Sequence, residues 1–188
     1  GIRYHREDWS RFTIPGGQRY EPFSRDIPGD YSSATFFFVL PAITGSSLEI
    51  TGLDPDDPQG DKEVLGILEE MGALIERKPR SITVTGPKPR RAGGRGLTGG
   101  TFDLNSMPDA LPALAVAACT AAEPVRLVNV AQAREKETDR IAVMAEELRK
   151  MGADLDEIDD GLEIRPSRLR GATVDAHEDH RVAMALAV

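Results

Sequence analysis

The chain has 188 residues, 40% of them hydrophobic and 29% charged, with 31 acidic against 23 basic side chains. This length and hydrophobic content suffice for a folded core, so the composition excludes a disordered protein. The net charge of −8 argues against a general nucleic-acid or anionic-membrane surface, so any anion site must be local. A single cysteine, Cys119, excludes an internal disulfide and fits a cytoplasmic protein. The apolar runs are all shorter than the ~20 residues of a membrane span.

Both ends of the chain suggest that it belongs to a longer protein. It starts at Gly1 rather than Met, and an apolar helical pattern runs to Val188 without a terminating signal. We therefore expect further residues on either side.

Helices and strands alternate in an order that recurs. The first set predicts a helix, strand, helix and strand, at residues from Asp30 onward, 46–53, 61–76 and 81–86. The second set repeats this order at residues 108–122, 124–130, 138–157 and 161–166. A third copy begins with a strand at 171–176 and a helix at 178–188. This repetition predicts an α/β domain of packed βαβ-type units.

Acidic residues stand at equivalent helix starts in the three copies. Asp30, Asp109 and Asp179 can each cap free backbone NH groups, and Gly72 and Gly152 can terminate the second helix of each full copy. Equivalent helix starts that converge would form an anion-binding site.

The segment from Arg77 to Phe102 carries seven basic residues and no acid. It could contact phosphate or RNA, but aromatic stacking partners are sparse. We interpret it as a solvated connector rich in glycine and proline.

Candidate site residues gather in "KETDR", residues 136–140. Lys136 and Arg140 lie near a helix start, where the helix dipole disfavours cations. The simpler interpretation is a capped helix in which Glu137 and Arg140 form a surface ion pair. In the catalytic interpretation the two cations bind an anionic substrate and Glu137 exchanges a proton with it.

"EDHR", residues 178–181, presents a similar set at the third helix. His180 could be an ordinary surface or capping histidine, whereas the fork of Arg181 suits a carboxylate or phosphate. Asp109 could serve as an N-cap alone. If these side chains converge with those of "KETDR", they supply acid, base and cations at one place.

Seven motifs in this order resemble the C-terminal part of the 5-enolpyruvylshikimate-3-phosphate synthase family: "GDYSSATFF", "QGD", "MGA", "PDALPALAVAA", "KETDR", "ELRKMGA" and "DHRVAMALAV". The resemblance runs from about Gly16 to Val188 and is carried chiefly by "KETDR" together with "DHR". It implies a two-domain enzyme in which each domain has three βαβαββ units. Here about two units are complete and a third is truncated.

The resemblance also implies domain boundaries. Residues 1–24 would lead in from the other domain, and residues 25–188 would form one domain with units at about 25–85, 102–166 and 171–188.

The implied reaction transfers the enolpyruvyl group of phosphoenolpyruvate to the 5-hydroxyl of shikimate 3-phosphate, without metal or organic cofactor, in the cytoplasm. Asp109 would be the base near the 5-hydroxyl, Lys136 would contact shikimate 3-phosphate and assist proton transfer, and Glu137 would exchange the methylene proton. Arg140, Arg181 and His180 would hold phosphoenolpyruvate.

The chain departs from the family pattern in two respects. Gln132 stands where many members have Asn, and the other domain is absent together with a C-terminal lysine. We therefore expect about half an active site, inactive alone, from an enzyme that is monomeric when complete and binds neither nucleic acid nor membrane.

Two other functions stay open. One is a related enolpyruvyl transferase with a UDP-sugar acceptor, which "KETDR" with "DHR" argues against. The other is a binding module of the same fold without catalysis, which the absent domain favours.

Overall fold

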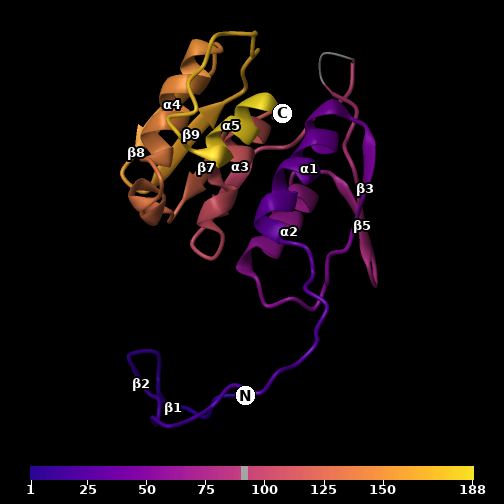
Figure 1. Ribbon diagram of the computed structural model, residues 1–188. Helices are drawn as coiled ribbons and strands as arrows, with labels where there is room; N and C mark the ends of the chain where they lie inside the picture. The colour runs from indigo at the N-terminus through magenta and orange to yellow at the C-terminus, as the bar shows by residue number, and fades with distance from the viewer. Residues whose placement is uncertain (90–92) are drawn as a thin grey trace.

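Two units with the same order of elements form the body of the molecule (Figure 1). The computed structural model describes residues 1–89 and 93–188. The first unit contains α1 (Tyr31–Thr44), β3 (Ser47–Thr51), the 3₁₀ turn η1 (Gly60–Glu63), α2 (Val64–Glu70), β4 (Leu74–Lys78) and β5 (Ser81–Thr85). The second contains β6 (Gly100–Asp103), η3 (Pro108–Ala110), α3 (Leu111–Cys119), β7 (Val125–Val128), η4 (Ala131–Glu135), α4 (Arg140–Lys150), β8 (Asp154–Ile158) and β9 (Gly161–Arg165). α5 (His180–Ala187) follows.

Each unit builds its own sheet by the same pairing. The first sheet has the order β3-β5-β4, with all pairs antiparallel. The second has the order β6-β7-β9-β8, in which β6 pairs parallel with β7 and the remaining pairs are antiparallel. In both, a hairpin follows the second helix and its second strand joins the strand that precedes that helix. This agreement identifies an α/β fold made by repetition.

α3 is the central helix of the body. All nine of its residues are buried, and it packs against α1, α4 and α5 as well as β9. Its sequence, LPALAVAAC, has no polar face, which suits a helix covered on all sides. Because most of its side chains are small, neighbouring helices approach closely, and their N-terminal ends can meet.

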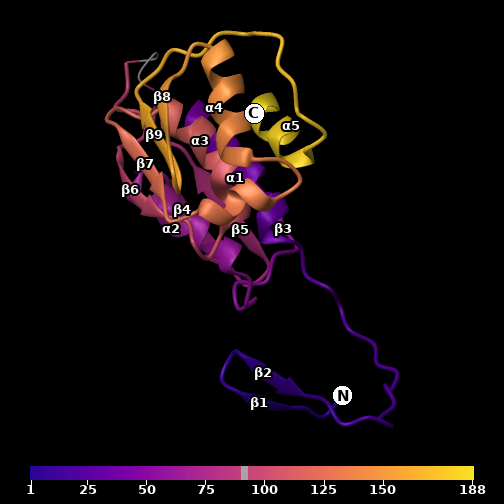
Figure 2. The ribbon, with the colours of Figure 1, turned by 90° about the vertical axis from the view of Figure 1, so that its left-hand side faces the viewer.

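The N-terminal segment leaves the body altogether. It contains a short hairpin, β1 (His5–Glu7) with β2 (Arg11–Thr13), which lies apart from the rest in both views (Figures 1 and 2). Trp9, Tyr20 and Phe23 in this segment are each at least 80% exposed. Its assignment to another domain stays a prediction.

The predicted second helices are too long. α2 ends at Glu70 and α4 at Lys150, and the residues assigned to their last turns form β4 and β8. Gly72 and Gly152 adopt φ values of 100° and 90°, which favour glycine and turn the chain out of the helix. The strands then form because each has a hairpin partner.

The strand predicted at residues 171–176 is wrong, since this segment contains no strand. A strand needs a neighbour for its backbone groups, and here the amide of Asp175 instead donates to the side chain of Glu147 at 3.0 Å.

The connector predicted between Arg77 and Phe102 is also shorter than expected. β4 extends to Lys78 and β6 begins at Gly100, whereas β5 (Ser81–Thr85) confirms the strand predicted at residues 81–86. Residues 90–92 of this segment lie outside the described residues.

Two glycines of contrasting surroundings test the packing. A Cβ at Gly161 in β9 would overlap the carbonyl oxygen of Leu127 in β7, whereas a Cβ at Gly66 in α2 meets nothing within 4 Å. We expect Gly161→Ala to lower the free energy of unfolding by about 2 kcal/mol or more, since backbone must move. Gly66→Ala, the matched control, should raise it by about 0.5–1 kcal/mol. Urea unfolding measures both, and a harmless Gly161→Ala would contradict the close strand contact.

Candidate active site

Helix starts from both units bring the candidate residues together. Asp30 and Asp179 cap α1 and α5, as predicted, by accepting from the amides of Ser32 and Ser33 and of Arg181 and Val182, respectively. Asp109 is not a cap, which corrects that interpretation: it lies inside η3, and no side-chain capping bond occurs at η3 or α3. Its carboxylate is therefore available to side chains of other elements.

Arg140 is the most deeply buried charged group of the site. Its side chain is fully buried at the first position of α4. Nε and Nη2 donate to Asp179 at 2.7 and 3.3 Å, Nη1 donates to Asp109 at 2.8 Å, and Nη2 also donates to Glu137 at 2.6 Å. One guanidinium thus joins three carboxylates from three parts of the chain.

Asp109 lies at the centre of a second set of ion pairs. Lys136 Nζ is 3.2 Å from its Oδ1, and Arg181 Nη2 is 3.2 Å from its Oδ2. Burial alone would raise the pKa of Asp109, but Arg181, Lys136 and Arg140 hold it below its usual value. The carboxylate is therefore ionised at neutral pH.

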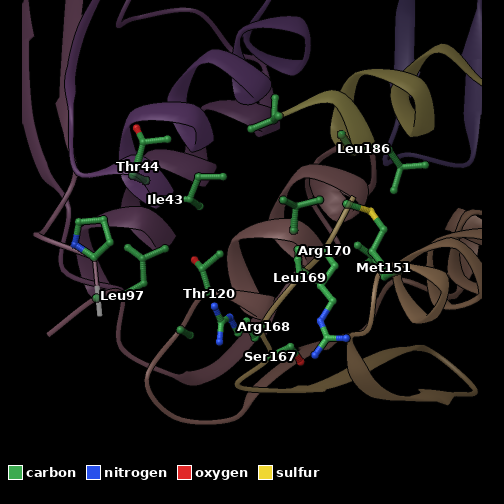
Figure 3. A pocket seen from close by; sticks show the side chains of 18 of the residues that line it. Ile43, Thr44, Leu97, Thr120, Met151, Ser167, Arg168, Leu169, Arg170 and Leu186 are labelled. Carbon is green, nitrogen blue, oxygen red and sulfur yellow. The ribbon is translucent and has the colours of Figure 1, made fainter. Parts of the chain in front are cut away.

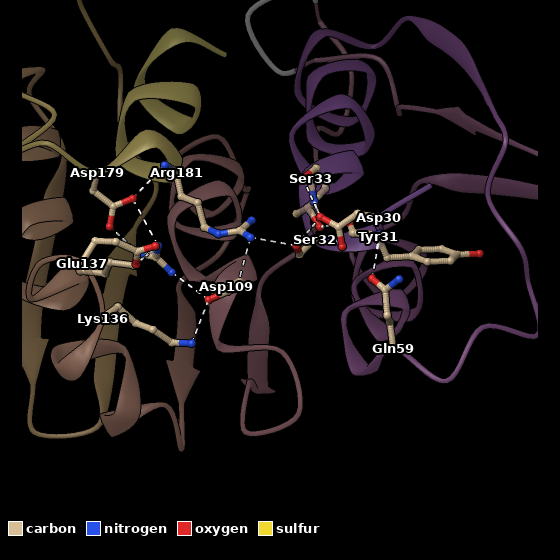
Figure 4. A network of polar contacts seen from close by, with 12 residues as sticks. Asp30, Tyr31, Ser32, Ser33, Gln59, Asp109, Lys136, Glu137, Asp179 and Arg181 are labelled. Atoms are coloured by element: carbon tan, nitrogen blue, oxygen red, sulfur yellow. Dashed lines mark hydrogen bonds and ion pairs between the residues drawn. The ribbon is translucent and has the colours of Figure 1, made fainter. Parts of the chain in front are cut away.

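Arg181 reaches across from α5 to the first unit (Figure 4). Its Nη2 donates to Ser32 Oγ at 2.9 Å, at the start of α1. Its Nη1 is buried and has no hydrogen-bond partner in the described residues. A buried guanidinium donor without a partner is unfavourable, so this atom is suited to an incoming anion.

Asp61, in the "QGD" motif, carries the other buried side-chain atom without a partner in the described part of the chain. Burial and the nearby charge of Asp109 raise the pKa of Asp61. The site therefore holds one carboxyl group whose pKa is raised and one whose pKa is lowered.

The remaining candidates lie at the rim. The side chain of Glu137 is 48% exposed and contacts solvent beside its bond to Arg140. Lys136 lies just after η4 and before the N-cap of α4, Asp139, so it is outside the helix. His180 is exposed, and its side chain makes no hydrogen bond within residues 1–89 and 93–188. Five of the six predicted residues therefore belong to one network, and His180 is adjacent to it in sequence.

This geometry explains the cations at the start of α4. Lys136 is not in the helix, and Arg140 is turned toward carboxylates that outweigh the weak helix dipole. The cap and the ion pair of the simpler interpretation are both present, since Asp139 caps α4 and Glu137 pairs with Arg140. The pair is not a surface pair, however, because the side chain of Arg140 is fully buried.

A cavity of about 910 Å³ lies elsewhere (Figure 3). Its lining comes from the C-terminal ends of α1, α3, α4 and α5, with residues such as Thr44, Thr120, Met151 and Leu186. The candidate site lies at the opposite, N-terminal ends of these helices. None of the described residues that line this cavity is acidic, so this part of the chain places no acid–base group of the network there.

Comparison with known proteins shows to which family the chain belongs. The family model described as EPSP synthase (3-phosphoshikimate 1-carboxyvinyltransferase) matches residues 2–188. The chain belongs to the EPSP synthase family. It is 54% identical over its whole length to the 3-phosphoshikimate 1-carboxyvinyltransferase of Ruminiclostridium cellulolyticum and 51% identical to that of Acetivibrio thermocellus. A solved EPSP synthase from Acinetobacter baumannii superposes with a TM-score of 0.76 at 30% identity, covering 98% of this chain and 44% of the other.

The chain spans 43% of the length of each of these two curated EPSP synthase relatives. In the part of the chain that the structure describes, every helix is too short or too polar to cross a membrane.

Sequence reasoning missed two contributors to this candidate site. Ser32 and Asp61 were visible only as parts of "GDYSSATFF" and "QGD", motifs that supported the resemblance. Gln132, the departure from the family pattern, is partly buried and donates to the carbonyl of Asn105 at 3.1 Å. Within the described residues, its side chain makes no hydrogen bond to the ion-pair network.

The buried guanidinium predicts a large loss of stability on substitution. Arg140→Met would leave Asp179 buried without its cation, and we expect a loss of about 3–5 kcal/mol in the free energy of unfolding at pH 7. The matched control is Arg77→Met, because Arg77 also binds a carboxylate bidentately but on the surface. That change should cost less than about 1 kcal/mol. Equal losses in denaturant unfolding would contradict the central position of Arg140.

The same network predicts a pH dependence. The folded-state pKa of Asp179 is lowered, because bonds from Arg140 and the α5 amides outweigh burial. Its stabilisation is therefore present above the unfolded pKa near 3.8 and is lost as the pH falls through the lower folded value. In Asp179→Asn, unfolding measured between pH 7 and 2 should lose part of the acid dependence seen in the unsubstituted chain. An unchanged acid profile would contradict this assignment.

Proposed function

We propose that this chain supplies one side of an active site that transfers the enolpyruvyl group of phosphoenolpyruvate to the 5-hydroxyl of shikimate 3-phosphate and releases phosphate. The observation that carries the proposal is the Arg181 guanidinium, which is buried between two units, has one donor without a partner in the described part of the chain, and contacts Asp109, which also binds Lys136. The names of the relatives support the same reaction.

Arg181 is the anion-binding group of this proposal. Its Nη1 would donate to the carboxylate or phosphate of phosphoenolpyruvate, and His180 would lie nearby. Because Nη2 is already fixed by Ser32 and Asp109, the guanidinium is oriented before the donor binds. Little side-chain freedom then remains to be lost on binding.

Asp109 would accept the proton of the 5-hydroxyl as that oxygen attacks C2 of phosphoenolpyruvate. Its cations make it a weak base in the free chain. Substrate anions that draw Arg181 and Lys136 toward themselves would raise its pKa and so strengthen it. Lys136 would contact the acceptor and help return the proton.

Glu137, when protonated, would donate to C3, which converts the methylene to a methyl group and gives a tetrahedral intermediate. It would then take a proton back from C3 as the C–O bond to phosphate breaks. Arg140 would bind phosphoenolpyruvate through the guanidinium donor that now bonds Glu137. Glu137 is half-exposed, so a substrate anion can replace it there. The bonds to Asp109 and Asp179 would remain.

The other side of the site belongs, in this proposal, to the additional length that the relatives possess. We place the reaction in the cytoplasm in a monomeric enzyme, without a metal or organic cofactor.

Substitutions separate binding from proton transfer. The enzyme for this test is a chimera in which the chain replaces the matching region of the R. cellulolyticum relative. Arg181→Ala should raise KM for phosphoenolpyruvate at least tenfold, with a smaller effect on shikimate 3-phosphate, since a charge-assisted bond is worth about 1.5–3 kcal/mol. Glu137→Gln should lower kcat and reduce deuterium incorporation from solvent into the methylene group. Equal effects of both substitutions on donor affinity alone would contradict the assigned roles.

An acceptor control tests the reaction class. The chimera should use shikimate 3-phosphate and not UDP-N-acetylglucosamine. Turnover of the UDP-sugar, or no turnover with either acceptor, would argue for the alternative functions.

The chain alone should bind anions weakly and turn nothing over, because both substrates must be held in a closed site. Phosphoenolpyruvate added to the labelled chain should shift NMR signals around Lys136–Arg140 and Asp179–Arg181, with a Kd of about a millimolar. Added salt should weaken the effect. Phosphate release by the chain alone would refute the proposed half-site.

A further inference from the structure

A second buried carboxylate on α4 lies outside the network of Arg140. The side chain of Glu147 is fully buried, two helical turns after Arg140 on the same side of α4. Its Oε1 lies 2.7 Å from Lys150 Nζ and 3.0 Å from His177 Nε2, and its Oε2 accepts from the amide of Asp175 at 3.0 Å. The proposed reaction does not use it.

Two of the partners of Glu147, Asp175 and His177, belong to the turn that leads into α5. In this turn His177 and Glu178 have φ values of 50° and 60°, a conformation that L-residues other than glycine rarely adopt. Such residues persist only where surrounding contacts fix them. The turn ends at Asp179, whose carboxylate caps α5 and binds Arg140.

α4 therefore holds the turn at two points about 10 Å apart along its axis. Arg140 binds Asp179 at one end, and Glu147 binds Asp175 and His177 at the other. Arg181 follows directly, so its position depends on how the turn is held.

We propose that Glu147 and His177 form a positioning pair, which fixes the turn of residues 175–179 and thereby places Asp179 and Arg181, and which holds more firmly when His177 is protonated. The link from Arg181 to a substrate rests on the proposed function, whereas the holding of the turn does not.

Charge around His177 supports the pH dependence. Glu146, Glu147 and Lys150 face it from α4, and Asp175 faces it from its own turn. The hydrogen bond with Glu147 raises the pKa of His177, while bonds from Lys150, Asp175 and His177 overcome burial and lower the pKa of Glu147 to about 2. Because the folded-state pKa of His177 is raised, the contribution is fully present below the unfolded value near 6.5 and is lost as the pH rises through the folded value.

The cluster is not interpreted as a metal site. Glu146, Glu147 and His177 are close together, but Lys150 Nζ lies 3.0 Å from Glu146 and 2.7 Å from Glu147. The ammonium group already contacts both carboxylates, so a metal ion would have to displace it.

Amide hydrogen exchange in the 188-residue chain tests the pair without any substrate. The amides of Arg181 and Val182 donate to Asp179, so their protection factors report how well the turn is held. The unsubstituted chain should show protection at pH 5.5 that exceeds the value at pH 8.5 several-fold. His177→Phe should lower it about tenfold at pH 5.5, as expected for losing a charge-assisted bond.

His177→Gln keeps a donor but cannot titrate, so it should remove most of the pH difference. The difference between His177→Gln and the unsubstituted chain isolates His177. His5→Gln, a substitution in the distant hairpin, is the matched control and should change nothing at these amides.

Amides of β5 serve as the internal reference for global unfolding. If His177→Phe lowers the protection of the β5 amides as well, that substitution destabilises the whole chain, and the test then rests on His177→Gln. Protection at Arg181 and Val182 that stays within twofold in His177→Gln, with the full pH difference retained, overturns the proposal.

The chimera supplies a second and separate readout. Both His177 substitutions should raise KM for phosphoenolpyruvate more than they lower kcat, since they displace a binding group. Loss of amide protection without a change in KM would support the positioning pair and would contradict the role given to Arg181.

Discussion

The fully buried Arg140 guanidinium is the interaction on which the site depends, because it fixes three carboxylates that the chain delivers separately. Asp109 comes from η3, Glu137 from the segment before α4, and Asp179 from the start of α5. Desolvating a cation costs free energy that only closely placed anions can offset. The three segments must therefore meet in one arrangement, or the buried charge is left unpaired.

This constraint links stability to the proposed chemistry. Asp109, one of the carboxylates that stabilise Arg140, also contacts Lys136 and Arg181. Its negative charge therefore acts both on the buried guanidinium and on the cations at the rim. Arg181 in turn contacts Ser32 of the first unit. A substitution at either end of this series of contacts, Arg140 or Ser32, therefore alters both the packing between units and the electrostatic field at the anion-binding donor of Arg181.

The helices and the strands β3, β5, β7 and β9 could be predicted from the sequence, because their apolar patterns are local. The starts of α1 and α5 at Asp30 and Asp179 were confirmed, as were the turns at Gly72 and Gly152. Prediction failed where a non-local partner decides the outcome: β4 and β8 are strands because hairpin partners exist, and residues 171–176 are not, because Glu147 takes a backbone amide there. The division into three units stays a prediction.

For the site, the sequence by itself determined the residue types and their place at helix starts, and it indicated the family through "KETDR" and "DHR". It could not determine that Asp109 is no cap, that Arg140 is fully buried, or that Arg181 bonds Ser32 through Nη2 while its Nη1 has no partner among the described residues. Only the tertiary structure decided these, because electrostatic energies and pKa values depend on distance and burial. The distances between residues that are far apart in the sequence are fixed only when the units pack.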